Sequence, residues 1–351
     1  MQCKRARLIG EKQFQLETVE FPKVNGNPII KVTHVGICGS DVHFWEDGNA
    51  SGKDVVLGHE YTGIVEDPGT TGLKKGDRVV GYTQNPGNDP CGCCPACLAG
   101  NFAECPNRVV QVSLGCSTKH PGAYSEYVTW YPSGVYKLPD QVASDEAALL
   151  EPLAVGYHAL KLSGIRSGAK VLILGGGIIG LGVAEWASVF GAEKIVMTEL
   201  SAPKRERIEK LHVVDRLYAA DDPDLEEKLR AETPGGYDLV FDCVALSAPF
   251  NMGLRLLRRG RAVEDGGTCV VVGVNFKPIS MDIYETVVFQ KRILGSKGHT
   301  PDDFKAVLRA LAAGKLDLKK YITRRIRLEQ VQETFEHLKA GGDDIKVLIE
   351  F

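Results

Sequence analysis

The chain has 351 residues, of which 44% are hydrophobic, and it carries a formal net charge of -3 with a pI near 6.3. This length suits two domains with separate cores. The charge balance leaves no basic stripe and no acidic tail, so we expect no nucleic-acid partner. No apolar run has the length of a signal peptide or a membrane span, so we expect a cytoplasmic protein that does not enter membranes.

The first part of the chain, from Met1 to about Pro139, is predicted to be rich in β-strands. Short apolar runs over 29–35, 61–65 and 78–82 are separated by Gly, Pro, Asn and Asp. A helical pattern follows over 144–162. The sequence therefore predicts a β-rich domain that ends near a helix.

From Ala169 to about Lys291, strand-like and helix-like segments alternate. The expected strands cover 171–174, 195–198, 238–242 and 268–273, and the expected helices cover 178–190, 204–211 and 250–259. Such alternation predicts an α/β domain with a doubly wound parallel sheet. Beyond it we expect helices over 302–313 and 328–340, an extended run over 321–327 and a strand over 346–351.

A dense group of reactive side chains lies between Gly36 and His43, where two glycines are expected to let the backbone turn sharply around Cys38. Cys38 and His59 are suitable ligands for a catalytic zinc, which takes three protein ligands and keeps a fourth position open. Glu60 and Glu151 compete for the third place, and the residues alone do not rank them. Glu151 could instead serve helix-start electrostatics, and Glu60 could orient His59 or a water.

Ser40 and His43 follow Cys38 by two and five residues. A hydroxyl and an imidazole at this spacing suit a relay that removes a proton from the reacting centre. The alternative for His43 is an ordinary, partly exposed histidine.

A second metal site is predicted in a loop lobe over about 84–110. Four cysteines stand there at the spacing C-x2-C-x2-C-x7-C: Cys91, Cys94, Cys97 and Cys105. Four thiolates without an open position match a structural zinc, whereas disulfides are rare in a chain without export signals. Cys93 is a spare that could compete in register.

A dinucleotide site is predicted by Gly175, Gly177 and Gly180, which form G-x-G-x-x-G directly after a strand and open the next helix. Glu199 ends the following strand, where a carboxylate that binds the ribose is expected, and this favours NAD over NADP. Lys204 and Arg205 follow a few residues later and could accept a 2′-phosphate instead. Further cofactor contacts are expected at these positions: Ile178, Ile179, Val272, Gly273 and Val274.

These motifs together resemble the zinc-dependent medium-chain alcohol dehydrogenase superfamily, over essentially the whole chain. The run from Cys38 to Trp45 and the run from Ala148 to Gly156 are most similar to the polyol (sorbitol-type) dehydrogenases. In that branch a carboxylate stands at Glu151, where typical alcohol dehydrogenases place a third sulfur ligand.

The resemblance implies a GroES-like catalytic domain over 1–152 and 293–351, with a Rossmann domain over 153–292 and the active site in the cleft between them. It implies two zinc ions per subunit, one catalytic and one structural, and a homodimer or homotetramer. By the same resemblance Cys38, His59 and Glu151 are zinc-site residues, and Glu60 is a ligand or a water-bridged neighbour. Ser40 and His43 then match the proton relay.

The expected substrate is a small polar molecule with a secondary alcohol, such as a polyol, cyclitol or sugar, oxidised with NAD(P). Phe44 stands where sorbitol dehydrogenases carry a Tyr, and the run that contains Lys297 and His299 departs from their pattern. These three residues are therefore the expected substrate contacts, and sorbitol itself is in doubt. An L-threonine 3-dehydrogenase or aldose dehydrogenase is the alternative. A non-enzymatic NAD-binding sensor is disfavoured, because it has no need for an open zinc site.

Overall fold

The computed structural model describes residues 1–22, 26–47, 54–83, 94–98, 114–116, 118, 120–261, 265–275 and 277–351. The chain falls into two compact units, one formed by Met1–Glu151 with Leu308–Phe351 and the other by Pro152–Val307. The first unit therefore draws on both ends of the chain, and the second is a single inserted segment.

Most strands of the first unit form one sheet with the order β14-β15-β3-β4-β5-β7, and β6 pairs with β3 beside this path. The strands are β3 (Ile29–Gly36), β4 (Glu60–Asp67), β5 (Arg78–Gly81), β6 (Tyr127–Thr129), β7 (Val135–Lys137), β14 (Ile322–Arg327) and β15 (Lys346–Glu350). β1 (Gln2–Gly10) and β2 (Gln13–Glu20) form a separate antiparallel hairpin. The C-terminal strand β15 thus pairs with β3 from the first part of the chain.

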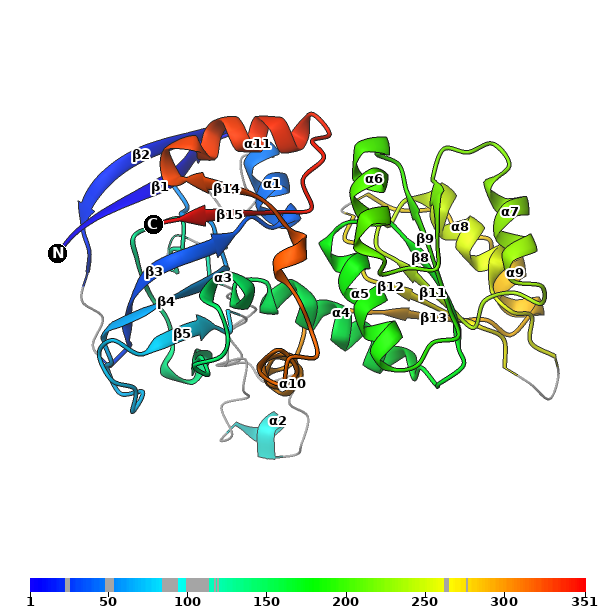
Figure 1. Cartoon of the computed structure of the whole chain (residues 1–351), viewed down its shortest axis with the longest axis horizontal. Coiled ribbons are helices and arrows are strands. Elements are labelled where there is room, and N and C mark those ends of the chain that lie inside the picture. The colour runs from blue at the N-terminus through cyan, green and yellow to red at the C-terminus, as the bar shows by residue number, and fades with distance from the viewer. Residues whose placement is uncertain are drawn as a thin grey trace. The chain divides into compact units, whose positions relative to one another are not determined.

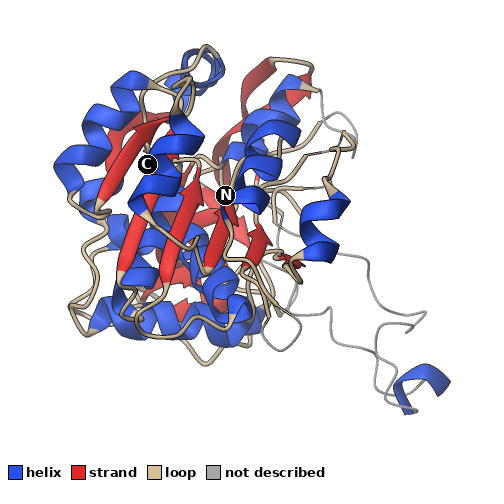
Figure 2. Cartoon of the chain, turned by 90° about the vertical axis from the view of Figure 1, so that its right-hand side faces the viewer, coloured by secondary structure: helices blue, strands red, loops and turns tan. Residues whose placement is uncertain are grey.

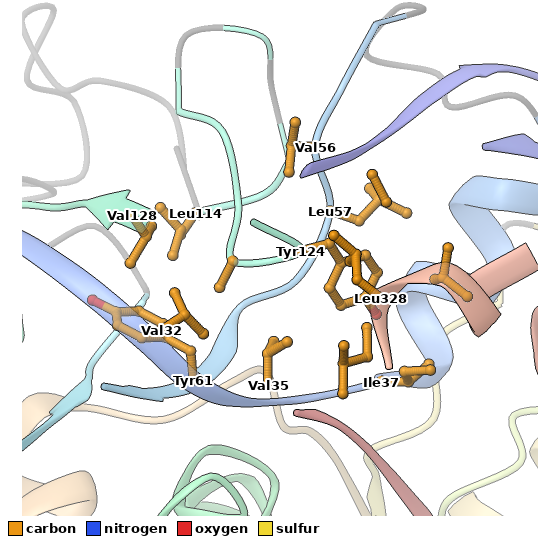
Figure 3. Close-up of a cluster of buried hydrophobic side chains, with 14 of the residues drawn as sticks. Val32, Val35, Ile37, Val56, Leu57, Tyr61, Leu114, Tyr124, Val128 and Leu328 are labelled. Atoms are coloured by element: carbon orange, nitrogen blue, oxygen red, sulfur yellow. The ribbon is translucent and has the colours of Figure 1, made fainter. Parts of the chain in front are cut away.

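The helices of this unit are short. They are α1 (Gly39–Glu46), α2 (Pro95–Leu98), α3 (Ser144–Ala147) and α11 (Val331–Lys339), with single 3-10 turns at Pro132–Gly134, Lys319–Tyr321 and Leu328–Gln330. The core of the unit lies against the sheet. In Figure 3 Tyr124 lies in this core beside Leu57 and Leu328; Val35 comes from β3 and Ile37 follows that strand directly.

The second unit is built on a parallel sheet with the order β10-β9-β8-β11-β12-β13. Its strands are β8 (Lys170–Leu174), β9 (Lys194–Glu199), β10 (Arg216–Ala219), β11 (Leu239–Asp242), β12 (Thr268–Val271) and β13 (Arg292–Gly295). The central strand β8 is buried from Val171 to Leu174. A continuous apolar run is expected for a strand that is covered on both faces.

Helices alternate with these strands. They are α5 (Ile178–Val189), α6 (Ala202–Leu211), α7 (Leu225–Glu232), α8 (Ser247–Leu256) and α9 (Ile283–Val288). Figure 1 shows α5 and α6 on one face of the sheet and α7 and α8 on the other, and Figure 2 shows the strands between helices. The predicted fold class, a GroES-like β-rich domain with a Rossmann domain, is confirmed.

Several elements escaped the sequence analysis. These are α1, β10, α7, α9 and β13. All are short, with four to eight residues, so their periodic pattern is brief. The helix expected over 144–162 is divided into α3 and α4 (Leu150–Ser163), and the helix expected over 302–313 is α10 (Pro301–Ala312).

The second domain boundary also differs from the expected one. The sequence predicts that the catalytic domain resumes at residue 293. In the structure, however, β13 pairs in parallel with β12 as the sixth strand of the second unit's sheet. That unit extends to Val307. Across the described residues, none of the helices combines the length and apolar character needed to pass through a bilayer.

Candidate functional site

The stretch around Cys38 forms the start of a helix instead of a simple turn. Cys38 has extended backbone angles and is the N-cap of α1. The carboxylate of Asp41 accepts a hydrogen bond from the backbone N–H of Cys38 at 3.2 Å. This is the spacing of a capping box, in which the third helical residue reaches back to the cap. Cys38 therefore lies between the end of β3 at Gly36 and the start of α1 at Gly39.

Cys38, His59 and Glu60 come together as predicted ligands should. Each offers a ligand atom, and these atoms lie within 4.8 Å of one another. Glu60 is 1% exposed, and the side chain of His59 is 12% exposed. Nδ1 of His59 makes no hydrogen bond to a described residue, and Asp41 Oδ1 lies 3.5 Å from it. Nδ1 thus faces a carboxylate, which leaves Nε2 as the ring nitrogen available to a metal.

The carboxylate of Glu60 occupies the space that a side chain at position 36 would fill. Gly36 on β3 is the partner of Glu60 on β4, and a Cβ at Gly36 would lie 2.0 Å from Glu60 Oε2. The missing side chain leaves room for the carboxylate to meet Lys346 on β15, whose ammonium lies 2.9 and 2.7 Å from its two oxygens. Lys346 also donates to the carbonyl of Ile37 at 2.9 Å. The sequence predicted that Gly36 allows a sharp turn around Cys38. In the structure, Gly36 instead makes room for the carboxylate of Glu60.

The electrostatics of this group favour a cation. Burial alone would lower the pKa of His59, but the charges of Asp41 and Cys38 outweigh burial and raise it well above 6.5. Burial alone would likewise lower the pKa of Lys346, but Glu60 and Cys38 raise it above 10.5. Burial raises the pKa of Glu60, Lys346 opposes this rise and Glu151 adds to it. Such perturbed groups gather at functional sites more than elsewhere.

The donor set fits a zinc ion, because it combines a thiol, an imidazole and a carboxylate around partly buried space. Glu151 is 8% exposed and lies near enough for its charge to act on Glu60, Lys346 and Cys116. Among the described residues, however, it is not in the set whose ligand atoms lie within 4.8 Å of one another. Glu60 is therefore the carboxylate nearer to Cys38 and His59 in this structure, although it is also paired with Lys346.

Ser40, His43 and Phe44 are all carried by α1. Ser40 and His43 are exposed and lie three residues apart, so they share one face of the helix. Asp41 and Trp45 point the other way and are buried. Phe44 is partly buried and packs against the core of the first unit. The helix thus separates a polar exposed pair from the residues that hold the site.

Two residues beside the ligands were given no role from sequence. The pattern that could have revealed Asp41 is its capping-box distance from Cys38. Lys346 is separated from Glu60 by 286 positions, and no local pattern indicates that this lysine is buried. The sequence offered one indirect signal. Two carboxylates, Glu60 and Glu151, compete for a single zinc-ligand position, and a carboxylate that is buried without the metal needs another cation as its partner.

The glycine motif forms the turn between β8 and α5, and its three glycines differ in surroundings. Gly175 has φ +101°, which favours glycine. A Cβ at Gly177 would have no atom within 4 Å, whereas one at Gly180 would lie 2.0 Å from the carbonyl oxygen of Gly175. Ile178 and Ile179 open α5. The turn therefore leaves open space at Gly177 and a close backbone contact at Gly180.

Glu199 ends β9 beside this turn. Its carboxylate accepts hydrogen bonds from the N–H groups of Gly176 at 2.9 Å and Ser201 at 2.8 Å. Lys204 lies in the first turn of α6, and the guanidinium of Arg205 donates to the carbonyls of Glu199 and Leu200. These contacts hold the carboxylate of Glu199 at the carboxyl ends of the parallel strands.

The remaining cofactor positions lie at the same edge. Val272, Gly273 and Val274 follow β12 directly, as the glycine turn follows β8 and Glu199 ends β9. A Cβ at Gly273 would lie 2.9 Å from the backbone of Cys243, which follows β11. The carboxyl ends of four parallel strands thus meet where α/β sheets bind ligands.

The predicted substrate contacts of the second unit differ in exposure. Lys297 is exposed, but His299 is 4% exposed, and its ring stacks on Phe304 with centroids 5.6 Å apart. The structural zinc lobe over 84–110 lies largely outside the described residues, including Cys91, Cys105 and the side chain of Cys97. Cys94 is described and is buried.

One further group of metal-binding side chain types lies in the first unit: His337, Asp343 and Asp344. Arg324 already supplies a cation there, with Nε 2.7 Å from Asp344 Oδ2 and Nη2 3.1 Å from His337 Nε2. A metal would have to compete with this guanidinium. Glu60 is likewise paired with a cation, Lys346, but the group around Cys38 is the better zinc centre because it adds a thiol to the imidazole and carboxylate.

Two family models match the chain. The alcohol dehydrogenase GroES-like domain matches residues 25–140, and the zinc-binding dehydrogenase domain matches residues 179–313. D-xylulose reductase A from Aspergillus niger is 31% identical over 355 residues, which cover 97% of this chain and 95% of that protein.

Solved structures agree with these matches. The 2R,3R-butanediol dehydrogenase from Bacillus subtilis is 27% identical with a TM-score of 0.86, and the match covers 99% of each chain. A zinc-binding dehydrogenase from Sinorhizobium meliloti 1021, solved with NADP, is 28% identical with a TM-score of 0.85, and the match covers 100% of each chain. L-idonate 5-dehydrogenase from Escherichia coli shares the fold, with 23% identity and a TM-score of 0.83.

Proposed function

Because the chain belongs to the zinc-dependent medium-chain alcohol dehydrogenase superfamily, in its polyol dehydrogenase branch, we propose that it interconverts a secondary alcohol of a polyol or sugar alcohol and the matching ketone with NAD. The enzyme is an NAD(P)-dependent oxidoreductase. The proposal rests on one observation: the thiol of Cys38, the imidazole of His59 and the carboxylate of Glu60 lie close together. The same chain also carries the glycine turn.

Cys38 and His59 are the proposed protein ligands of a catalytic zinc, together with Glu60 or Glu151. A bound zinc would polarise the substrate oxygen and acidify its hydroxyl. Lys346 holds Glu60 in place while the carboxylate is near the metal position, and Asp41 orients the imidazole. The choice between the two glutamates rests on distance, which favours Glu60 here, and on the charge of Glu151 nearby.

Ser40 and His43 are the proposed route for the proton that leaves the alcohol. Both are exposed on one face of α1, so a proton that reaches them passes to solvent without crossing the core. Phe44, Lys297 and His299 remain proposed substrate contacts. Of these, Phe44 is the one whose ring is partly committed to the core of its own unit.

NAD is the proposed coenzyme. The carboxylate of Glu199 lies at the glycine turn, where it would accept hydrogen bonds from ribose hydroxyls and repel a 2′-phosphate. The guanidinium of Arg205 is occupied by two backbone carbonyls, which leaves Lys204 as the nearby cation for a phosphate. The S. meliloti relative was solved with NADP, so both coenzymes belong in the test.

We further propose a second, structural zinc on Cys91, Cys94, Cys97 and Cys105, and a homodimer or homotetramer. Support for a second copy is the apolar exposed surface of α9, where Ile283 and Val287 are 56% and 66% exposed, together with the edge position of β13 in its sheet. The free thiols of Cys3, Cys116 and Cys269 suit a reducing compartment such as the cytoplasm.

The test follows NADH and NADPH absorbance with purified protein across polyols, inositols, aldoses, L-threonine and simple diols, in both directions. We expect turnover of a polyol or its ketose with NAD(H), and loss of turnover with retained NADH binding in Cys38→Ser. Turnover confined to L-threonine or to an aldose would overturn the polyol assignment. Absence of zinc from the purified protein, with no turnover of any compound, would overturn the enzyme mechanism.

A further inference from the structure

Tyr124 is fully buried in the core of the first unit, and its hydroxyl donates a hydrogen bond to Asp41 Oδ2 at 2.8 Å. The same carboxylate faces His59 with its other oxygen, Oδ1, at 3.5 Å from Nδ1. Asp41 Oδ2 also accepts the backbone N–H of Cys38. One buried carboxylate therefore touches both predicted zinc ligands, and Tyr124 is the side chain that holds it from the core.

We propose that Tyr124 is a positioning residue for the zinc site, acting through Asp41 on His59 and Cys38. The inference rests on the proposed zinc function of Cys38 and His59. It adds a residue, more than sixty positions from either ligand, to the group that sets the geometry and affinity of the metal centre.

The backbone ties Tyr124 to the segment that carries His59. The N–H of Tyr124 donates to the carbonyl of Leu57 at 2.9 Å, and the N–H of Ala123 donates to that of Gly58 at 2.9 Å. Gly58 has φ +96°, and a Cβ there would lie 2.5 Å from the ring of Tyr124. The ring thus rests on the residue before His59, so ring and imidazole are fixed by the same short stretch of chain.

The direction of the hydrogen bond is also fixed. Burial raises the pKa of Tyr124 well above 10, and the charge of Asp41 raises it further, so the phenol keeps its proton and donates. A carboxylate that receives two donors on Oδ2 presents Oδ1 to the imidazole. This arrangement turns Oδ1 of Asp41 toward Nδ1 of His59, 3.5 Å away, and leaves Nε2 as the ring nitrogen available to a metal. Partners of this kind change metal affinity by about 10–100-fold when they are removed.

The test replaces the hydroxyl and keeps the ring, in Tyr124→Phe. The matched control is Tyr61→Phe, because Tyr61 is equally buried in the same core and its hydroxyl has no hydrogen-bond partner among the described residues (Figure 3). The readouts are zinc affinity by chelator competition and the absorption spectrum of the cobalt-substituted protein. Cys38→Ser identifies which bound ion belongs to this site.

We expect the zinc dissociation constant of this site to rise about 10–100-fold in Tyr124→Phe and to stay unchanged in Tyr61→Phe. The thiolate-to-cobalt band should shift in Tyr124→Phe alone, a signature that mere loss of stability does not produce. Wild-type affinity and spectrum in Tyr124→Phe would overturn the positioning role while leaving the zinc function standing. A wild-type protein whose bound zinc is unaffected by Cys38→Ser would overturn the zinc function, and this role with it.

Discussion

The ammonium of Lys346 lies 2.7 Å and 2.9 Å from the two carboxylate oxygens of Glu60, and both residues are 1% exposed. A fully buried ion pair of this kind gives little net stability, because both charges are taken out of water. Its presence beside Cys38 and His59 suits a site that needs a carboxylate held near a metal position. The pair should therefore be far more sensitive to the loss of one partner than to the loss of both.

Lys346→Met tests this asymmetry. The variant leaves Glu60 buried without its cation, and we expect the free energy of unfolding to fall by about 3–5 kcal/mol. Adding Glu60→Gln should recover a large part of that loss, since the double variant buries no lone charge. Urea unfolding of the metal-free protein measures both. Equal stabilities of wild type and Lys346→Met would show that Glu60 is not charged in the folded protein.

The space that Gly36 leaves for this pair gives a second prediction. A methyl group at Gly36 would lie 2.0 Å from Glu60 Oε2, so Gly36→Ala must displace the carboxylate from Lys346. We expect a loss of about 1–3 kcal/mol in urea unfolding, with weaker zinc binding. Gly39→Ala is the matched control, because a Cβ at Gly39 would meet no atom within 4 Å. A loss in Gly39→Ala as large as that in Gly36→Ala would point to backbone flexibility instead of space.

The glycine turn gives a third prediction, in which two alanine variants separate binding from folding. A Cβ at Gly177 enters open space, so Gly177→Ala should keep its melting temperature within about 2 °C and bind NADH at least about tenfold more weakly. A Cβ at Gly180 meets the carbonyl of Gly175 at 2.0 Å, so Gly180→Ala should destabilise the second unit by about 1–3 kcal/mol. Calorimetry and fluorescence titration with NADH measure the two effects. The reverse pattern would contradict the assignment of open space to Gly177.

The contrast between these sites shows what could be predicted from sequence. The glycine turn is local, because strand, turn and helix follow each other within about ten residues, and so its place was predicted correctly. Cys38, His59 and Glu60 were found by their chemistry and by resemblance, and the distances among them came only with the structure. The classes of side chain were visible, but their geometry was not.

Lys346 and Tyr124 could not have been found in the same way. Lys346 meets Glu60 only because β15 pairs with β3, and Tyr124 meets Asp41 through a side-chain hydrogen bond between residues 83 positions apart. The edge strand β13 was missed for a related reason. It has four residues, begins with Arg292 and is identified by its pairing with β12 more than by its own pattern.

Asp303 gives the last prediction, which concerns acid stability. Its side chain is 0% exposed and receives hydrogen bonds from His158 at 2.7 Å and Lys161 at 2.9 Å on α4, and from Thr300 at the start of α10. Burial alone would raise the pKa of Asp303, but these bonds outweigh burial and lower it far below 3.8. A lowered folded-state pKa adds stability above the unfolded-state pKa, and this contribution is lost as the pH falls through the window below it.

Asp303→Asn should therefore cost about 2–3 kcal/mol in urea unfolding of the second unit between pH 5 and 8, because the asparagine accepts weaker hydrogen bonds from Lys161 and Thr300. The difference from wild type should shrink as the pH is lowered below about 4, where the unfolded carboxyl binds a proton that the folded one resists. Asp302→Asn is the control, since the side chain of Asp302 is 90% exposed and lies 3.9 Å from Lys305. A stability difference for Asp303→Asn that stayed constant down to pH 2 would mean that Asp303 is not ionised in the folded protein.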